Sequence, residues 1–270
     1  MPSFLEITPD KLTRIMGTPN LPTIIDVRND EDFGSDPRLI PGSIRRDFRR
    51  VTEWGPYVSS PAIVFCQKGQ KLGHGVAAHL RAMGKQAEVL EGGFEAWRDS
   101  QGLLVPEGKL PVRDANGRTV WVTRARPKID RIACPWLIRR FIDPSAIFLF
   151  VPASEVALVG DRFAATPFDI EDVFWSHRGE LCTFDVMVEE FCLTSEPLLR
   201  LARIVRGADT ARPDLAPEVS GLLAASLGLS RMFNDDLEHL EAGLTLYDAF
   251  YRWCRDATGE SHNWPNPRKG

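Results

Sequence analysis

Cys66 is the residue whose neighbours in the sequence most directly suggest chemistry. It follows the apolar run Ala62–Phe65 and opens a short loop that leads into a predicted helix. The loop consists of Gln67, Lys68, Gly69, Gln70 and Lys71. Backbone N–H groups of such a loop and the N-terminus of the helix can point at the sulfur, which favours the thiolate. Lys68 and Lys71 add positive charge at the rim, so the segment predicts a reactive thiolate that receives a small anion.

Alternating strand and helix signals around this loop predict the elements that position it. Three short runs of β-branched and apolar residues predict buried strands, at 23–27, 62–65 and 88–90. Helical patterns lie between them at 9–16, 73–83 and 94–98, and Thr8 followed by Pro9 is typical of a helix start. Strands that alternate with helices imply right-handed crossovers and a parallel sheet.

Four segments in this region, in order, resemble the rhodanese family. They are Ile25–Arg28, Ile40–Ile44, the Cys66 loop and Leu90–Trp97, and together they span about residues 3–102. The resemblance implies a sulfurtransferase in which Cys66 takes sulfur from an anionic donor such as thiosulfate. The resulting persulfide would pass that sulfur to cyanide or to another thiol. The resemblance also implies that Asp26 and Arg28 are scaffold residues near the loop.

The length of the loop argues against phosphatase chemistry, which the same fold also supports. The phosphatase loop has one more residue and ends in arginine, whereas the sixth residue after Cys66 is Leu72. Leucine cannot clamp a phosphoryl group through paired hydrogen bonds. Lys71 stands where many rhodanese-family members carry Arg, Thr or Ser, which leaves the donor preference open. A loop that only binds anions is the alternative to an enzyme.

A basic segment opens the second half of the chain. Nine basic and two acidic residues lie between Lys109 and Arg140, although the net charge of the whole chain is −4. Arg124, Lys128 and Arg131 surround Pro127, which fits the first turn of a helix, and His177 follows later in the chain. These four cationic side chains predict a pocket for a small oxyanion. The alternative is that Arg131, Arg139 and Arg140 pair with acids on neighbouring helices.

A metal site is a second hypothesis for this half, although no cofactor is otherwise expected. Asp185 and Glu189 lie four residues apart on one face of a predicted helix, and His239 lies three residues after Asp236. This spacing resembles carboxylate–histidine sites in helical bundles. The candidate ligands of this hypothesis are His177, Glu189 and His239.

The second half also resembles the C-terminal domain of ChrB-type chromate-resistance proteins. The matching segments lie between about residues 121 and 257: Trp121–Phe141, Phe148–Pro152, Ala165–Asp169, His177–Gly179 and Leu201–Thr210. The resemblance implies a link to chromate, which is a tetrahedral dianion. Regulators of this family carry a different N-terminal domain, and a net negative charge opposes duplex binding, so no nucleic-acid partner is expected.

The domain organisation follows from these patterns. We expect an α/β rhodanese-like parallel-sheet domain over 1–103, a linker over 104–120, a mainly α-helical second domain with few strands over 121–257, and a polar tail over 258–270. The clear strand of the second domain is 147–151. Its last helix is predicted to begin at an Asn234 N-cap and to bury one face. That face consists of Leu237, Leu240, Leu244, Tyr247, Tyr251 and Cys254.

Composition points to a cytoplasmic protein without a membrane span. The chain has 43% hydrophobic residues, no run of about 18 apolar residues and no secretory signal at Met1–Glu6. Five scattered cysteines without a CxxC pair argue against a disulfide framework or a cysteine-rich zinc site. The favoured function is a Cys66 sulfurtransferase associated with chromate or oxyanion resistance. The alternatives are a non-enzymatic chromate-binding or chromate-sensing protein and a metal-dependent oxidoreductase in the second domain.

Overall fold

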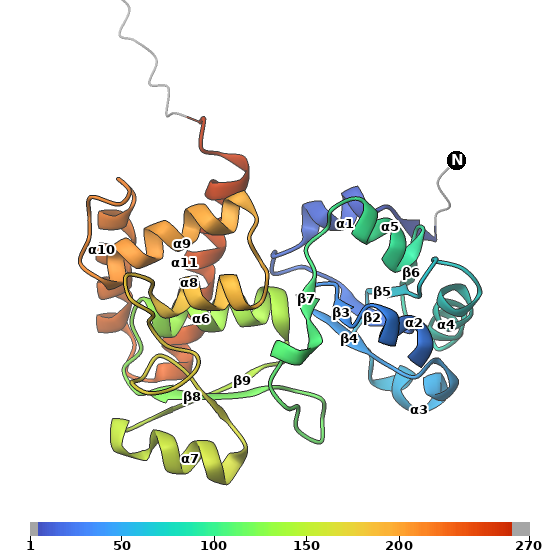
Figure 1. Ribbon diagram of the computed structural model, residues 1–270, viewed down its shortest axis with the longest axis horizontal. Helices are drawn as coiled ribbons and strands as arrows, with labels where there is room; N and C mark the ends of the chain where they lie inside the picture. The colour runs from blue at the N-terminus through green and yellow to red at the C-terminus, as the bar shows by residue number, and fades with distance from the viewer. Residues whose placement is uncertain (1–4, 261–270) are drawn as a thin grey trace, which may run out of the picture.

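A five-stranded parallel sheet forms the centre of the N-terminal domain in the computed structural model, which describes residues 5–260 (Figure 1). The strand order is β1-β6-β5-β2-β4. Their bounds are β1 Glu6–Ile7, β2 Thr23–Asp26, β4 Ser43–Arg45, β5 Ala62–Phe65 and β6 Ala87–Leu90. Every pairing in this sheet is parallel, so the α/β class predicted for this domain is confirmed.

Helices cover both faces of this sheet, which explains why the strands β2, β5 and β6 are almost entirely buried. The helices are α1 Pro9–Ile15, α2 Asp30–Ser35, α3 Val51–Trp54, α4 Lys71–Ala82 and α5 Gly93–Asp99. Ile25 and Val64 share a core with residues of α3 and α4 on one face. Ile24 and Ile63 share a core with residues of α1 and α5 on the other. Successive side chains of a strand point to opposite faces, so neighbouring residues contribute to different cores.

The segment predicted as a linker is partly built into the first domain. β7, Val105–Pro106, pairs antiparallel with β3, Arg38–Leu39, and a 3₁₀ turn follows at Glu107–Lys109. Two further 3₁₀ turns of the first domain lie at Phe48–Arg50 and Gly55–Tyr57.

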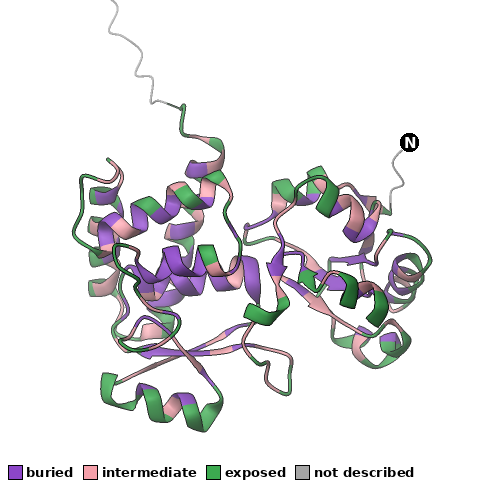
Figure 2. Ribbon diagram, viewed as in Figure 1, coloured by how far each residue is buried: buried purple, intermediate pink, exposed green. Residues whose placement is uncertain are grey.

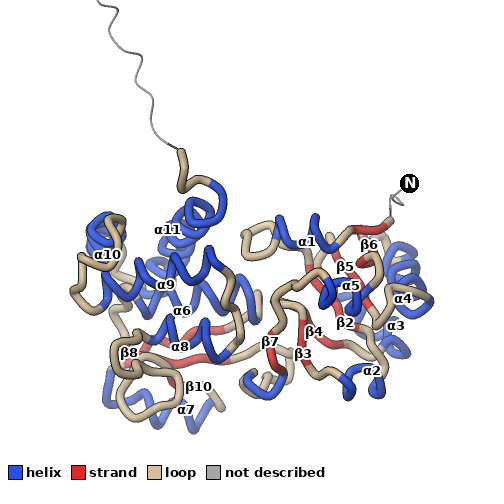
Figure 3. Tube along the Cα trace, turned by 45° about the horizontal axis from the view of Figure 1, so that its top comes forward, coloured by secondary structure: helices blue, strands red, loops and turns tan. Residues whose placement is uncertain are grey.

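The second domain packs helices beside a three-stranded parallel sheet of order β10-β8-β9. The strands are β8 Val120–Arg124, β9 Ile147–Val151 and β10 Thr166–Pro167, and α7, Val156–Phe163, follows β9 after a 3₁₀ turn at Ala153–Glu155. The other helices are α6 Asp130–Leu137, α8 Thr183–Glu190, α9 Glu196–Asp209, α10 Val219–Met232 and α11 Asp236–Asp256. A π-helical turn over Ile138–Ile142 extends α6. Figure 3 shows the strands of the two sheets in separate lobes, and the mainly helical second domain is confirmed.

Aromatic side chains hold the helical core of the second domain together. Trp136 of α6 is fully buried and contacts Phe184 of α8, Tyr247 and Tyr251 of α11, and Phe141. Buried residues follow α6 and α8 through the centre of this lobe, whereas much of α7 and α10 is exposed (Figure 2).

The two domains touch directly. Gly42 N donates a hydrogen bond to Phe141 O at 2.6 Å, and Arg255 Nη1 donates one to Met16 O at 3.2 Å. Gly17 has a φ of +73°, and a Cβ at this position would lie 2.4 Å from Cζ of Phe141. Only glycine allows this close approach of the first domain to the aromatic core of the second.

Several local expectations need correction. β8 was not predicted, and α6 begins at Asp130 rather than at Pro127, because the chain turns at Arg126 and Ile129 with positive φ. Asp235, not Asn234, caps α11 by accepting hydrogen bonds from the amides that follow it. The predicted buried face of α11 is present except for Leu237, which is 51% exposed.

Within residues 5–260, no helix combines the length and the apolar character needed to cross a membrane. The predicted polar tail lies outside the described residues from position 261 onward.

Candidate functional site

The sulfur of Cys66 lies at the N-terminus of a twelve-residue helix. Cys66 directly follows β5 and is 5% exposed, and Gln70, the N-cap residue of α4, donates its backbone N–H to Sγ at 3.3 Å. The helix adds partial positive charge at this end. Both features direct positive potential at the sulfur. The contact from Gln70 confirms that the loop curls back onto the sulfur.

A second loop holds the cysteine loop in this shape. Phe94 N donates to Cys66 O at 3.0 Å, and Glu95 N donates to Gln67 O at 3.0 Å, so the first turn of α5 binds the start of the cysteine loop. Gly93 has a φ of +62°, and a Cβ there would lie 2.2 Å from Cys66 O. The sequence showed Gly92–Gly93 as a conspicuous pair after a strand, but it did not reveal that Gly93 contacts the cysteine loop.

The side chains of the cysteine loop divide into a buried part and an exposed rim. Gln67 is half-buried and its amide nitrogen lies 3.2 Å from Oε1 of Glu95. Gly69, with a φ of +60°, packs against the backbone of the Gly92–Gly93 turn. Lys68 and Lys71 are exposed, so both can reach an anion that approaches from solvent.

Asp26 and Arg28 form a fully buried ion pair beneath the loops, with Nη2 of Arg28 2.6 Å from Oδ2 of Asp26. Arg28 also donates to the carbonyl oxygens of Asp36 and Arg38, and its guanidinium lies 3.8 Å from the ring centroid of Phe94. Burial raises the pKa of Asp26, and the Arg28 guanidinium opposes that rise. Arg28 therefore links the end of β2 to the helix whose first amides bind the cysteine loop.

In the second domain, three carboxylates surround His177. We call Asp130, Asp169, His177 and Asp209 the carboxylate cluster. Nε2 of His177 lies 3.5 Å from Oδ2 of Asp130, 3.4 Å from Oδ1 of Asp169 and 3.3 Å from Oδ2 of Asp209. Asp130 opens α6, Asp209 ends α9, Asp169 follows β10, and His177 lies in the loop before α8.

Burial and neighbouring negative charges raise the pKa values of several groups in this cluster. Asp130 is fully buried, and its pKa is raised well above the ordinary range by desolvation and then by the charges of Asp209 and Asp169. The pKa of Asp209 is raised by burial and by Asp169. The hydrogen bond to Asp169, together with the other carboxylates, raises the pKa of His177 to about 9. The imidazole is therefore held as a cation by its neighbours.

The predicted oxyanion pocket needs correction. The structure brings Arg124, Arg131 and His177 together, but all three face Asp169: Nε of Arg131 lies 3.3 Å and Nη2 of Arg124 4.0 Å from its Oδ2. Lys128 is exposed. Carboxylates that already engage these donors repel an oxyanion, so the alternative of arginines paired with acids describes the structure better. Arg140 follows the same pattern and pairs with Asp248 at 2.7 Å.

The predicted metal ligands also need correction, because the structure does not bring Glu189 or His239 to His177. Glu189 is exposed near the end of α8. His239 is buried on α11, stacks on Phe233 with ring centroids 6.4 Å apart, and has its pKa lowered by burial. Sequence reasoning missed Asp130, Asp169 and Asp209, each of which is an ordinary acid in its local sequence. Only their distance to His177 in the fold reveals them.

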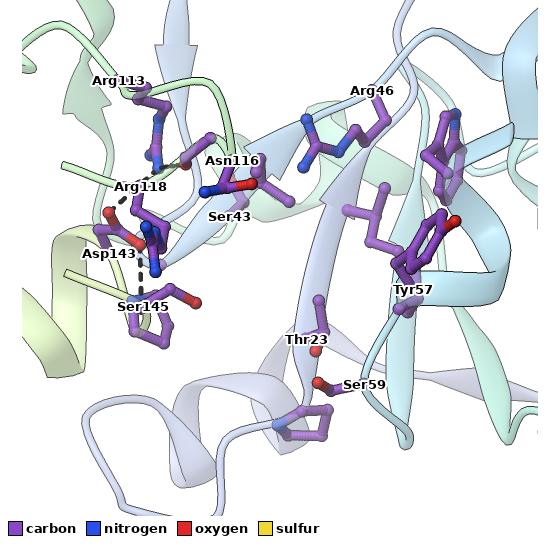
Figure 4. A pocket seen from close by; sticks show the side chains of 18 of the residues that line it. Thr23, Ser43, Arg46, Tyr57, Ser59, Arg113, Asn116, Arg118, Asp143 and Ser145 are labelled. Atoms are coloured by element: carbon purple, nitrogen blue, oxygen red, sulfur yellow. Dashed lines mark hydrogen bonds and ion pairs between the residues drawn. The ribbon is translucent and has the colours of Figure 1, made fainter. Parts of the chain in front are cut away.

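A cleft of about 540 Å³ lies where the two domains meet. Figure 4 shows Arg46 and Tyr57 on one side of this cleft and Arg118, Asp143 and Ser145 on the other, with Thr23 and Ser59 below. None of these residues was singled out by the sequence.

Two family models match the chain. Residues 8–100 match the model of the rhodanese-like domain, and residues 121–254 match the model of the ChrB C-terminal domain. Protein ChrB of Cupriavidus metallidurans is 37% identical in an alignment of 170 positions, and the match covers 57% of this chain and 50% of that protein. The chain therefore spans about half the length of this curated relative.

Among solved structures, a rhodanese-related protein from Thermoplasma volcanium is 20% identical and has a TM-score of 0.34; the match covers 38% of this chain and 100% of that one. A rhodanese-like domain protein from Staphylococcus aureus is 26% identical, with a TM-score of 0.31, over 34% of this chain and 89% of that one.

Proposed function

Because the chain joins a rhodanese-like domain to a ChrB C-terminal domain, we propose that it is a sulfurtransferase with a role in chromate resistance. Cys66 carries the transferred sulfur as a persulfide. The observation that supports this activity best is the position of Sγ, at the N-terminus of α4 and 3.3 Å from the Gln70 amide. The positive end of the helix favours both the attacking thiolate and the anionic persulfide that replaces it.

The reaction has two steps, written for thiosulfate as donor. The Cys66 thiolate attacks the outer sulfur, a new S–S bond forms at Sγ, and the bond between the two donor sulfurs breaks as sulfite leaves with the electron pair. Cyanide or a thiolate then attacks the outer persulfide sulfur, and Cys66 leaves as the thiolate. Lys68 and Lys71 attract the anionic donor to the loop, and the loop amides offset the negative charge on the thiolate and on the persulfide.

The role in chromate resistance rests on the second domain, through its match to ChrB. The carboxylate cluster is a poor receptor for a dianion, so this proposal does not place chromate at His177. In this proposal the chemistry is sulfur transfer by Cys66, and the second domain connects that activity to oxyanion stress.

A steady-state assay tests the activity. Thiocyanate formation from thiosulfate and cyanide is measured for the wild type and for Cys66→Ser, with Cys192→Ser as the matched control because Cys192 is a free, exposed cysteine. We expect turnover in the wild type and in Cys192→Ser, and a loss of at least about 1,000-fold in Cys66→Ser, since the nucleophile is removed. A wild type without turnover, towards either cyanide or a dithiol acceptor, would leave only the alternative of a non-enzymatic anion-binding loop.

A further inference from the structure

We propose that Asp130, His177 and Asp209 form a binding site for a divalent transition-metal ion in the second domain. One ligand atom from each residue lies within 4.8 Å of the other two, so a single ion can contact all three. This proposal does not depend on Cys66 or on its chemistry.

The buried carboxylate of Asp130 is the first argument. Asp130 is 0% exposed, and its Oδ1 has no hydrogen-bond partner among the described residues. Its Oδ2 accepts a hydrogen bond from Phe184 N at 3.3 Å and faces His177. A carboxylate buried with an unsatisfied oxygen is costly, and such groups are normally paired or bound to a metal. A cation in the cluster supplies the missing partner.

The placement of Asp209 is the second argument. Asp209 is the last residue of the fourteen-residue helix α9, where the helix dipole disfavours a negative charge. One of its carboxylate oxygens also lies within 4.8 Å of a carboxylate oxygen of Asp130. A single imidazolium is the cation that the three carboxylates of the cluster share most closely. A divalent ion relieves both the repulsion and the unfavourable helix end.

Asp169 lies beside this site and is held by other side chains. Its Oδ1 accepts a hydrogen bond from Oγ1 of Thr183 at 2.8 Å, and its Oδ2 lies 3.3 Å from Nε of Arg131. Both oxygens are engaged, yet Oδ1 also lies 3.4 Å from Nε2 of His177. Asp169 thus contacts the same nitrogen that faces Asp130 and Asp209, and Nε2 releases its proton when it binds an ion.

Exposure and ligand type indicate how an ion enters and which ion it is. The side chains of His177 and Asp209 are 41% and 20% exposed, so solvent reaches the rim while Asp130 forms the floor. One imidazole and two carboxylates suit Mn²⁺, Fe²⁺, Co²⁺ or Zn²⁺.

The experiment is a titration of the metal-free, full-length protein with Co²⁺, followed by calorimetry and by visible absorption of the bound ion. Cys66→Ser serves as the background, because a reactive thiol could itself bind cobalt. We expect one tight site, weakened about 100-fold or more by His177→Ala and by Asp209→Asn, since each removes a ligand. The matched controls are His74→Ala and Asp214→Asn, which change an exposed His and an exposed Asp elsewhere and leave binding unchanged.

Two results overturn the proposal. One is the absence of Co²⁺ binding in the background protein. The other is unchanged affinity in both His177→Ala and Asp209→Asn while circular dichroism shows that each variant is folded. Both altered side chains are partly exposed, so these variants are safer than a change at the buried Asp130.

An independent observation concerns the cleft between the domains, where we infer a binding site for an organic anion. Arg113 pairs with Asp143 at 3.3 Å and Arg118 pairs with Asp114 at 2.9 Å. Arg46 has no acidic partner among the described residues and lies beside Arg113. A half-buried guanidinium without a counter-charge is costly, and a bound anion supplies that charge.

The rest of the cleft adds polar and apolar contacts. Ser43 lines it and is 2% exposed, and its hydroxyl has no hydrogen-bond partner among the described residues. Leu21, Pro22 and Pro144 give an apolar wall, and Trp54 gives an aromatic one. A cavity of about 540 Å³ suits a small organic ligand better than a bare inorganic ion. The ligand class is thus an anion with an apolar or aromatic body.

Calorimetry with phenyl phosphate and with inorganic phosphate tests this inference. We expect phenyl phosphate to bind at least about ten-fold more tightly, because its ring removes apolar surface from water. Arg46→Ala should weaken phenyl phosphate binding about ten-fold or more, since it removes a charged hydrogen bond, whereas Arg49→Ala should have no effect. Arg49 is an exposed arginine outside the cleft, paired with Asp47 at 3.8 Å. Failure of phenyl phosphate to bind, or equal binding by both variants, contradicts the inference.

Discussion

The Cys66 loop and the carboxylate cluster are built for opposite charges. At Cys66, the backbone N–H of Gln70 at the start of α4 donates to Sγ, and the rim carries lysines. At His177, three carboxylates converge from separate elements, and one belongs to a helix C-terminus. The first arrangement places positive potential at the sulfur, and the second places negative potential around the imidazole. The comparison shows that a chain of net charge −4 can still contain one site with positive surroundings and one with negative surroundings. The positions of helix ends and acidic side chains decide which site is which.

The two sites also differ in what holds them. The cysteine loop depends on backbone hydrogen bonds from one neighbouring turn, and it rests on the buried pair Asp26–Arg28. The carboxylate cluster depends on side chains that the helical core brings together, and it places three acids around one imidazole. Substitutions in the supports of the cysteine loop should therefore lower both stability and sulfur transfer, whereas a bound metal ion should stabilise the carboxylate cluster.

Arg28→Met is expected to have the largest effect on stability. The substitution leaves the carboxylate of Asp26 buried without its guanidinium, and breaking a buried pair in this way costs about 3–5 kcal/mol. Urea unfolding of the full chain measures the change. A loss below about 1 kcal/mol would show that the pair does not support the first domain.

Gly93→Ala is expected to be nearly as damaging and to act on the loop itself. The new methyl group would lie too close to the carbonyl oxygen of Cys66, so the loop must shift. The alanine must also adopt a positive φ, and this backbone strain costs about 1–3 kcal/mol. Thiosulfate turnover should fall together with stability. Gly75→Ala on α4 is the control, because a Cβ there meets no atom within 4 Å; it should stabilise the helix by about 0.5–1 kcal/mol. Equal behaviour of the two variants would contradict the role given to Gly93.

Added metal should raise the free energy of unfolding through the carboxylate cluster and not through the Cys66 loop. At a Co²⁺ concentration one hundred times the dissociation constant, unfolding should require about 2.7 kcal/mol more than in metal-free protein. Asp209→Asn should lose this gain, whereas Gly93→Ala should retain it. A gain of equal size in Asp209→Asn would place the ion elsewhere.

The smallest effect is expected at the rim of the cysteine loop. Lys68→Ala and Lys71→Ala each remove one exposed charge, worth about 0.2–1 kcal/mol in attracting the donor. Each should raise KM for thiosulfate by a few-fold and leave kcat unchanged, and added salt should shrink the difference. A fall in kcat at unchanged KM would assign these lysines a different role.

The sequence predicted those parts of the molecule whose characteristic residues lie next to one another along the chain. The strand at Ala62–Phe65, the cysteine loop and the helix after it follow one another, and local rules of burial and loop length describe them. β8 was missed because its arginine and the basic residues after it suggested a helix start. Val120 and Val122 pack on the α7 side while Trp121 enters the main core, which is strand alternation.

The carboxylate cluster could not be predicted in the same way. Asp130 and Asp209 lie at the ends of different helices, where acids are unremarkable, and only the contacts among α6, α8 and α9 bring them to His177. Glu189 and His239 had a more suggestive local spacing, yet their helices orient them elsewhere. Spacing within one helix fixes a face of that helix, but it does not specify the neighbouring element that this face meets.

Mass spectrometry of the intact protein tests the central claim most directly. The reduced full chain is treated with a small excess of thiosulfate, measured, and then treated with cyanide. We predict that the wild type gains the mass of one sulfur atom, located at Cys66 by peptide mapping, and loses it to cyanide as thiocyanate, while Cys66→Ser gains nothing. A wild type that stays unmodified, or a sulfur found on Cys192 instead, would contradict the assignment of Cys66 as the sulfur carrier.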